Sequence, residues 1–300
     1  MPATLLDSAT AAATGSATGV PVRRPRPVPP GPLPAALYRP HQLPDVWQLA
    51  VSEHRAVIGD AHQVLDAAER RRHAELRIAA ERDRYAAAHL GLRRLLGAYL
   101  AVDPAEVVLD REPCPLCAGP HGRPAVPGAD LHFSLSHSGD LVLFAFGPTP
   151  VGVDVELLPE PEVADELADS LHPGETAELA RLAAPADRLA AFGRCWCRKE
   201  AYLKGIGTGL GVDPALAYVG AGERPTGLPG WTLADLAVPP GYAAAVAYAA
   251  PRSARPPDGR EPSGGHGPSD SQDSSDTGPF DVPTGSEIRN LSTAYHPLFP

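Results

Sequence analysis

The chain has 300 residues, and its 26 basic against 36 acidic side chains give it a net charge of −10. A balance this acidic argues against a protein that coats a nucleic-acid duplex, because such a protein needs a basic face. Many of the 36 prolines lie in the first 34 and the last 50 residues, and residues 35–250 have the regular apolar pattern of a sizeable core.

The cysteines and the hydropathy of the chain point to a cytoplasmic protein. Four cysteines are too few for a disulfide framework in a chain of this size. The first residues lack the basic and apolar segments of a secretion signal, and no apolar run approaches the roughly 18 residues of a membrane span. We therefore expect a protein that works in the cytoplasm and has no membrane partner.

The pattern of the chain predicts two folded lobes between two tails. The tails, 1–34 and 251–300, are rich in proline, glycine and small residues, and they bury too little to become ordered. The N-terminal lobe, 35–150, has a predicted strand at 47–51, helices at 66–80 and 81–101, a loop at about 111–130, and strands at 131–135 and 141–146. The C-terminal lobe, 151–250, has strands at 151–156, 215–219, 231–236 and 243–249, and helices at 173–183 and 185–205. The predicted fold class is α+β, each lobe being a small, mainly antiparallel sheet packed on a long helix.

The chain has two lysines, Lys199 and Lys204, and both lie in the predicted helix at 185–205. Arginine replaces lysine everywhere else, so two retained lysines suggest a need for a compact ammonium group. Helical spacing places Glu200 on the same stripe as Lys204. A Glu–Lys pair on the helix surface beside the core residue Trp196 explains the pattern equally well.

Two carboxylates follow each other on the strand at 151–156. Strand alternation places Asp154 and Glu156 on the face opposite the valines, beside Gly152. Adjacent acids repel unless a cation lies between them, and oxygen ligands of this kind suit Mg²⁺. Glu200 supplies a third carboxylate if its helix packs on this strand, whereas a solvated strand face is the alternative.

A polar segment, Phe133–Ser138, precedes a predicted Gly-Asp turn. Ser136 and His137 are suited to donate hydrogen bonds to a phosphate. A serine–histidine nucleophile is the rival interpretation, but no G-x-S-x-G elbow accompanies the pair. A serine that caps the turn beside a structural histidine is the simpler alternative.

Arginines gather at 70–72 and at 82, 84, 93 and 94. On an acidic protein this local excess suits an anion site. A solvated helix face explains the same arginines.

Cys114, Cys117 and His121 have the spacing of half a zinc knuckle. A structural zinc site normally needs four ligands, and the chain has no second C-x-x-C. The sequence therefore leaves open whether these residues bind a metal, and we do not predict a structural zinc site.

The motifs together resemble the surfactin-synthetase-activating (Sfp-like) type of 4′-phosphopantetheinyl transferase over roughly residues 65–210. The family's S-H-S segment, its G-V-D-V-E strand and its W-x-x-K-E-A-x-x-K helix match Phe133–Ser138, Gly152–Glu156 and Trp196–Lys204. Shorter matches lie at Gly122–Pro124 and Arg93–Gly97. The chain departs from the family pattern at Ser134, where the family has Asn, and at Glu75–Leu76, where an Arg-Phe pair is frequent.

The resemblance implies two pseudo-symmetric lobes that bind coenzyme A in a cleft, in a protein that acts as a monomer. It implies transfer of the phosphopantetheine arm to a serine of an apo acyl- or peptidyl-carrier protein, with release of adenosine 3′,5′-bisphosphate. The implied Mg²⁺ ligands are Asp154, Glu156 and Glu200. The implied phosphate-binding residues are Arg72, Arg93, Arg123, Ser136, His137, Lys199 and Lys204.

Two of these residues are predicted to be catalytic. Lys204 meets the charge that develops on the leaving bisphosphate, and Glu200 is the candidate base for the attacking serine. An inactive relative that binds coenzyme A or a carrier protein is the alternative function. A nucleic-acid-binding protein built on Cys114, Cys117 and the arginines is the second alternative, and the acidic net charge argues against it.

Overall fold

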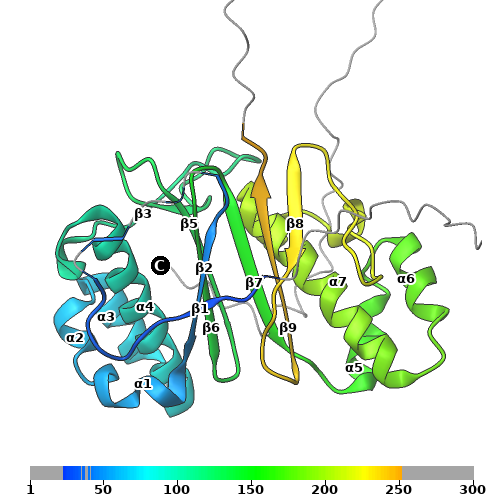
Figure 1. The fold of residues 1–300 in the computed structure, drawn as a ribbon, viewed down its shortest axis with the longest axis horizontal. Helices are drawn as coiled ribbons and strands as arrows, with labels where there is room; N and C mark the ends of the chain where they lie inside the picture. Colours follow the sequence, from blue (N-terminus) through cyan, green and yellow to red (C-terminus); the bar gives the residue numbers. More distant parts are fainter. Residues whose placement is uncertain (1–22, 35, 38–39, 41, 252–300) are drawn as a thin grey trace, which may run out of the picture.

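The computed structural model describes residues 23–34, 36–37, 40 and 42–251. These residues form four layers, in which two small sheets pack against each other and helices cover the outer face of each sheet (Figure 1). The predicted α+β class, with a sheet on each of two long helices, is confirmed. No helix of the described part is both long and apolar enough to cross a bilayer.

The first sheet has the strand order β1-β2-β6-β5 and carries helix α4 on its outer face. Its β1–β2 pair is parallel and the others are antiparallel. The strands are β1 (Arg26–Pro27), β2 (Asp45–Ala50), β5 (His132–Ser138) and β6 (Leu141–Gly147). The helices are α1 (Val51–Ile58), α2 (Ala61–Val64), α3 (Ala67–Glu75) and α4 (Ala79–Leu100), followed by the 3₁₀ turn η1 (Pro104–Glu106). A separate two-stranded ribbon consists of β3 (Asp110–Arg111) and β4 (Pro124–Ala125).

The second sheet is antiparallel, with the order β7-β9-β8, and carries helix α7 on its outer face. Its strands are β7 (Val151–Leu157), β8 (Trp231–Asp235) and β9 (Tyr242–Ala249). The helices are α5 (Pro161–Ala168), α6 (Pro173–Ala180) and α7 (Pro185–Ile206), and the 3₁₀ turns are η2 (Gly209–Gly211) and η3 (Pro214–Leu216).

Both faces of each sheet are buried, and alternate residues of one strand therefore belong to different cores. On β6, Val142 and Phe144 belong to the core under α4, whereas Leu143 belongs to the core between the sheets. On β9, Val246 faces the core between the sheets and Ala245 faces α7. Such strands read as nearly continuous apolar runs, as β6 does.

The structure corrects three details of the predicted elements. Residues 215–219 do not form a strand, because Asp213 accepts a hydrogen bond from the Ala215 N–H and starts the 3₁₀ turn η3. The predicted helix at 66–80 is interrupted at 76–78, between α3 and α4. Helices α1, α2 and α5 were not predicted. The predicted division into lobes at residue 150 stays a prediction.

The prediction of a disordered tail over 1–34 is wrong for residues 23–34. Pro27 lies on an edge strand, where its missing N–H costs no ladder bond, and Val28 is buried in the first core. Arg23 forms a bridge to Leu236 beside the second sheet, so this segment contacts both sheets. Residues 1–22 and 252–300, which hold the remainder of both predicted tails, lie outside the described residues.

Helix α7 crosses strand β7 at very close range, and two glycines make the crossing possible. A Cβ atom on Gly152 would lie 2.0 Å from the Ala201 carbonyl oxygen and 2.4 Å from the Gly205 nitrogen. A Cβ atom on Gly205 would lie 2.6 Å from the Trp231 ring. The glycines therefore determine how far the polar face of β7 lies from α7.

We predict that Gly152→Ala destabilises the protein by more than about 3 kcal/mol, because the added carbon meets backbone on α7 that has no room to move. This corresponds to a fall in melting temperature of about 6–12 °C. Gly222→Ala is the matched control, since nothing lies within 4 Å of its added carbon. Equal melting temperatures for the two variants would contradict the close crossing.

Candidate active site between strand β7 and helix α7

The polar face of β7 packs against α7 in the part of the strand that follows the Gly152 contact. Asp154 is 1 % exposed and Glu200 is 4 % exposed, while Glu156 is half-buried near the end of the strand. Lys204 lies one helical turn after Glu200 and reaches the same face of β7. The structure thus brings together all three predicted acidic residues and one of the two predicted ammonium groups, that of Lys204.

Asp154, Lys204 and Ser136 form a connected network. The Lys204 Nζ atom lies 2.6 Å from Asp154 Oδ1 and donates a hydrogen bond of 2.9 Å to Ser136 Oγ. Ser136 Oγ in turn donates to Asp154 Oδ1 over 2.9 Å. Ser136 therefore positions the aspartate and the lysine, and it does so from the first sheet.

Alternate serines along β5 join the first sheet to β7. Ser134 Oγ accepts a hydrogen bond from the Val153 N–H, and Ser138 Oγ accepts one from the Leu157 N–H. Because serine is small and carries both donor and acceptor, β7 can approach β5 closely without leaving these backbone groups unpaired. Ser134 and Ser138 were not predicted as site residues, although the alternation Ser-x-Ser-x-Ser placed all three on one strand face.

The acidic residues carry more negative charge than Lys204 neutralises. Asp154 Oδ2 and Glu200 Oε2 are buried without a hydrogen-bond partner. Burial and the Asp154 charge raise the pKa of Glu200 to about 8, and they raise the pKa of Glu156 to about 7. Unpartnered carboxylate oxygens that hold protons near neutral pH are the arrangement that a divalent cation would satisfy.

A second group of residues near Lys204 is suited to bind anions. Burial, together with the charges of Arg84 and Lys204, lowers the pKa of His137 to about 4. The imidazole is therefore neutral at neutral pH and is available as a hydrogen-bonding group. Arg84, on the first turns of α4, has a buried Nε atom without a hydrogen-bond partner. Arg84 belonged to the predicted arginine excess but was not predicted as a site residue.

Two of the predicted phosphate-binding arginines, Arg72 and Arg123, form ion pairs with nearby glutamates. Arg123 donates to Glu112 Oε2 over 3.0 Å and to the Gly205 carbonyl over 2.7 Å, which attaches its loop to the end of α7. Arg72, on α3, lies 3.5 Å from Glu75 and is 23 % exposed. Both remain accessible, so their predicted contact with phosphate stays a prediction.

The structure corrects the assignment of Arg93. Its side chain is fully buried, with Nε 2.6 Å from Glu69 Oε2 and Nη2 2.8 Å from Asp66 Oδ2. Its Nη1 atom donates to the Val107 carbonyl over 2.9 Å. Every nitrogen of Arg93 thus has a partner within the fold, where the side chain connects α3 to α4 and leaves no donor for a ligand.

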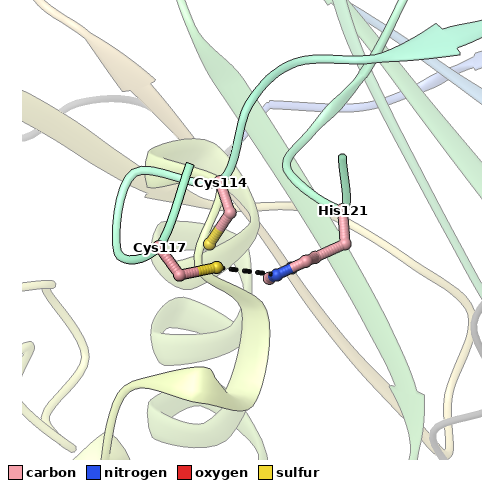
Figure 2. Close-up of side chains that lie close together, drawn as sticks. All are labelled: Cys114, Cys117 and His121. Atoms are coloured by element: carbon pink, nitrogen blue, oxygen red, sulfur yellow. Dashed lines mark hydrogen bonds between the residues drawn. The ribbon is translucent and has the colours of Figure 1, made fainter. Parts of the chain in front are cut away.

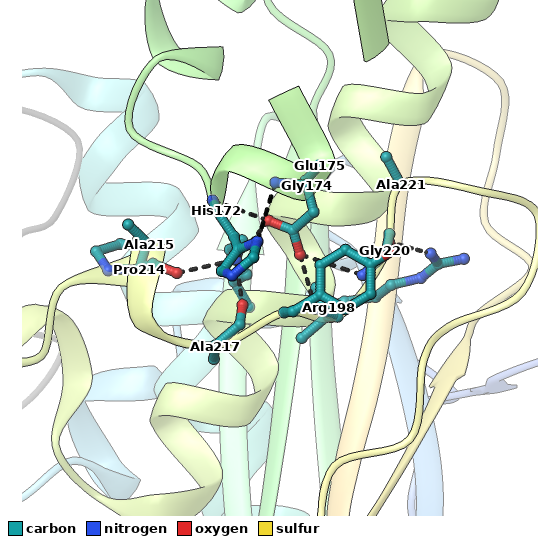
Figure 3. Close-up of polar contacts among 12 residues, drawn as sticks. His172, Gly174, Glu175, Arg198, Pro214, Ala215, Ala217, Gly220 and Ala221 are labelled. Atoms are coloured by element: carbon teal, nitrogen blue, oxygen red, sulfur yellow. Dashed lines mark hydrogen bonds and ion pairs between the residues drawn. The ribbon is translucent and has the colours of Figure 1, made fainter. Parts of the chain in front are cut away.

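Lys199 is corrected in the same way. It is 1 % exposed, and its Nζ atom lies 2.6 Å from Glu175 Oε2 and donates to the carbonyls of Pro214 and Ala217. Figure 3 shows Glu175 at the centre of this polar cluster. Its Oε1 atom also accepts hydrogen bonds from the backbone N–H groups of Val219 and Gly220. The ammonium of Lys199 therefore holds the segment after η2 against α6 and α7, away from solvent.

A buried carboxylate set beside an ammonium group, near a neutral histidine and an arginine whose buried Nε atom has no hydrogen-bond partner, is the kind of site that handles a phosphorylated substrate with a divalent cation. Comparison with known proteins narrows this class. Residues 150–235 match the 4′-phosphopantetheinyl transferase superfamily.

Curated relatives agree with this match. The chain is 30 % identical to the 4′-phosphopantetheinyl transferase HetI of Nostoc sp. over 213 residues, which cover 68 % of this chain and 86 % of the relative. It is 32 % identical to a phosphopantetheinyl transferase of Thraustochytrium sp., over 56 % of this chain and 62 % of the relative. The Bacillus subtilis transferase Sfp is 32 % identical over 40 % of this chain and 54 % of its own length. The chain belongs to the 4′-phosphopantetheinyl transferase superfamily.

We predict that Glu200→Gln stabilises the cation-free protein at pH 8.5 but not at pH 5. The raised pKa of Glu200 means that the folded state binds more protons than the unfolded state between about pH 4.5 and pH 8, so wild-type stability falls as the pH rises through this window. Glutamine carries no charge to bury, and we expect a gain on the order of 1–3 kcal/mol at pH 8.5, after discounting for coupling to Lys204.

Thermal unfolding in EDTA at both pH values measures this effect. Glu166→Gln, which removes an exposed acid on α5, is the matched control and should leave the pH profile unchanged. A Glu200→Gln profile parallel to that of the wild type would contradict the burial of an ionisable carboxylate here.

Proposed function

We propose that the protein is an Sfp-like, Mg²⁺-dependent transferase that moves the 4′-phosphopantetheine arm of coenzyme A to a serine of an apo acyl- or peptidyl-carrier protein. One observation carries this proposal. Asp154, Glu156 and Glu200 share one buried site with Lys204, although 44 residues separate Glu156 from Glu200 in the sequence.

The carboxylates fit a magnesium ion. Asp154 and Glu200 each present a buried oxygen without a partner, and Glu156 adds a third carboxylate at the open end of the site. Hard carboxylate oxygens are ligands that Mg²⁺ prefers. A bound Mg²⁺ would supply positive charge against the pyrophosphate oxygens of coenzyme A.

The cationic groups around the site would hold the phosphates of coenzyme A. Arg84 and His137 lie toward α4, and Arg123 lies at the end of α7. An arginine presents a fork of donors to phosphate, and a neutral imidazole still donates one hydrogen bond. Arg72 would extend this surface along α3.

Transfer requires the serine Oγ atom to form a bond to the phosphorus that carries the pantetheine arm. The bond between this phosphorus and the bridging oxygen breaks, and the oxygen leaves with adenosine 3′,5′-bisphosphate. Lys204 would neutralise the charge that develops on the leaving oxygen. Glu200, once its carboxylate is ionised, would accept the serine proton.

The remaining proposals concern context. We propose a monomer that works in the cytoplasm, folded as two lobes over 35–150 and 151–250, with neither a nucleic acid nor a membrane as partner. An inactive binding relative is the alternative, and the complete set of Asp154, Glu156, Glu200 and Lys204 argues against it. Loss of the chemistry would remove the need to keep unpartnered buried carboxylates, which cost stability.

Intact-mass measurement of an apo carrier protein tests the activity. Incubation with the full chain, coenzyme A and Mg²⁺ should add one phosphopantetheinyl group to the carrier. Asp154→Asn and Glu200→Gln should each slow the reaction by at least about 100-fold, because each loses a carboxylate of the site. Asp169→Asn, on an exposed residue after α5, should react like the wild type. A wild-type chain that binds coenzyme A but never modifies acyl- or peptidyl-carrier proteins would establish the inactive alternative.

We predict that Arg84→Ala raises the KM for coenzyme A by about tenfold or more, since a charge-assisted hydrogen bond contributes about 1.5–3 kcal/mol. Arg77→Ala is the matched control, because Arg77 is exposed on the turn between α3 and α4. Steady-state kinetics with varied coenzyme A measure both variants. A KM for coenzyme A that is the same in both would place the phosphate-binding surface elsewhere.

A further inference from the structure

The loop between β3 and β4 brings three metal-ligating side chains together. Cys114, Cys117 and His121 each offer one ligand atom, and these atoms lie within 4.8 Å of one another. Cys117 Sγ is 3.0 Å from His121 Nε2 (Figure 2). Cys114 is buried, whereas Cys117 and His121 are exposed, so the cluster is open to solvent on one side.

The backbone of this loop is arranged around the three side chains. The Cys114 N–H donates to the Gly119 carbonyl, and the Ala118 N–H donates to the Cys114 carbonyl, both over 2.8 Å. Ala118 takes a left-handed conformation, with φ of 57°, that residues other than glycine seldom adopt. The backbone N–H groups of Leu116 and Cys117 donate hydrogen bonds to the Cys114 sulfur. This pattern closes the turn and presents both sulfurs to the same side.

Gly119 keeps the space between the ligands open. A Cβ atom at this position would lie 3.0 Å from His121 Cδ2 and 3.3 Å from Cys117 Sγ. Any side chain at 119 would therefore push the imidazole away from the second sulfur. The two ends of the loop are fixed as well, because the Glu112 N–H donates to the Arg123 carbonyl over 2.8 Å.

We propose that Cys114, Cys117 and His121 bind one Zn²⁺ ion, with water in the fourth position. Two sulfurs and an imidazole are soft and borderline ligands that select zinc over magnesium. The site shares no residue with the carboxylates of the magnesium site. Three protein ligands and one water complete the tetrahedral coordination that zinc prefers, and the exposed side of the cluster admits the water.

The zinc site would hold the loop that carries Arg123 at the end of α7. Arg123 follows His121 by two residues and donates a hydrogen bond to the carbonyl of Gly205. Gly205 is the residue directly after Lys204. Zinc would therefore order a loop that adjoins the proposed active site, which is a structural role. This consequence for the active site rests on the proposed function, whereas metal binding itself does not.

The test is zinc binding by the full chain, without an affinity tag, reduced and freed of metal. Zinc per chain is measured after reconstitution and gel filtration, and Co²⁺ substitution reports thiolate ligands by its charge-transfer absorption. Cys117→Ser and His121→Ala remove ligands. The matched controls are Cys195→Ala, a buried cysteine of α7, and His62→Ala, an exposed histidine of α2.

We expect about one zinc per chain for the wild type and both controls, and well under half of that for Cys117→Ser and His121→Ala. Hydrogen exchange of residues 112–123 should slow when zinc binds, in the absence of coenzyme A and of any carrier protein. Zinc retention equal in all five proteins would overturn the proposal, as would the absence of a Co²⁺–thiolate band. A Cys114–Cys117 disulfide that persists in the reduced preparation would overturn it as well.

Because these readouts need no catalysis, a chain that binds zinc but transfers nothing would refute the proposed function alone. A chain that transfers the arm but binds no zinc would refute this inference alone.

Discussion

The contact between β7 and α7 is the constraint on which the site depends. Gly152 and Gly205 let the helix lie against the strand at backbone distance, and this closeness buries Asp154 beside Lys204. One ammonium then faces three carboxylates in a region with little water. Protons on Glu156 and Glu200 neutralise the surplus negative charge, and the proposed cation would replace these protons.

The buried charged residues of this protein fall into two groups. One group has its polar atoms paired within the fold, and the other keeps an oxygen without a hydrogen-bond partner. Arg93 with Glu69, and Lys199 with Glu175, have their polar atoms engaged within the fold, so they connect helices and loops. Removing one member of such a pair would leave a buried charge alone, which is strongly destabilising. Asp154 and Glu200 instead keep an oxygen without a partner. An unmet hydrogen-bonding capacity of this kind is a cost to the fold that binding of a ligand can offset.

Local patterns were enough to predict which polar residues of β7 and α7 lie together, but not the partners of the residues around them. Strand alternation placed Asp154 and Glu156 on one face, and helical spacing aligned Glu200 with Lys204. The same reasoning failed for Lys199, because its partner Glu175 lies 24 residues away in another helix, and no local pattern shows such a pairing. The segment at 215–219 has the apolar composition of a strand, but its Ala217 carbonyl accepts a hydrogen bond from that buried lysine. The role of Lys199 and the conformation of 215–219 therefore depend on contacts between distant residues, which the local sequence does not show.

We expect a divalent cation that binds this site to displace the protons of Glu156 and Glu200. Titration calorimetry of Mg²⁺ with coenzyme A at pH 7, in two buffers of different ionisation enthalpy, counts the protons released on binding. With pKa values of about 7 and 8 for Glu156 and Glu200, the wild type should release about one proton more than Glu200→Gln. Equal proton release by the two proteins would contradict the account.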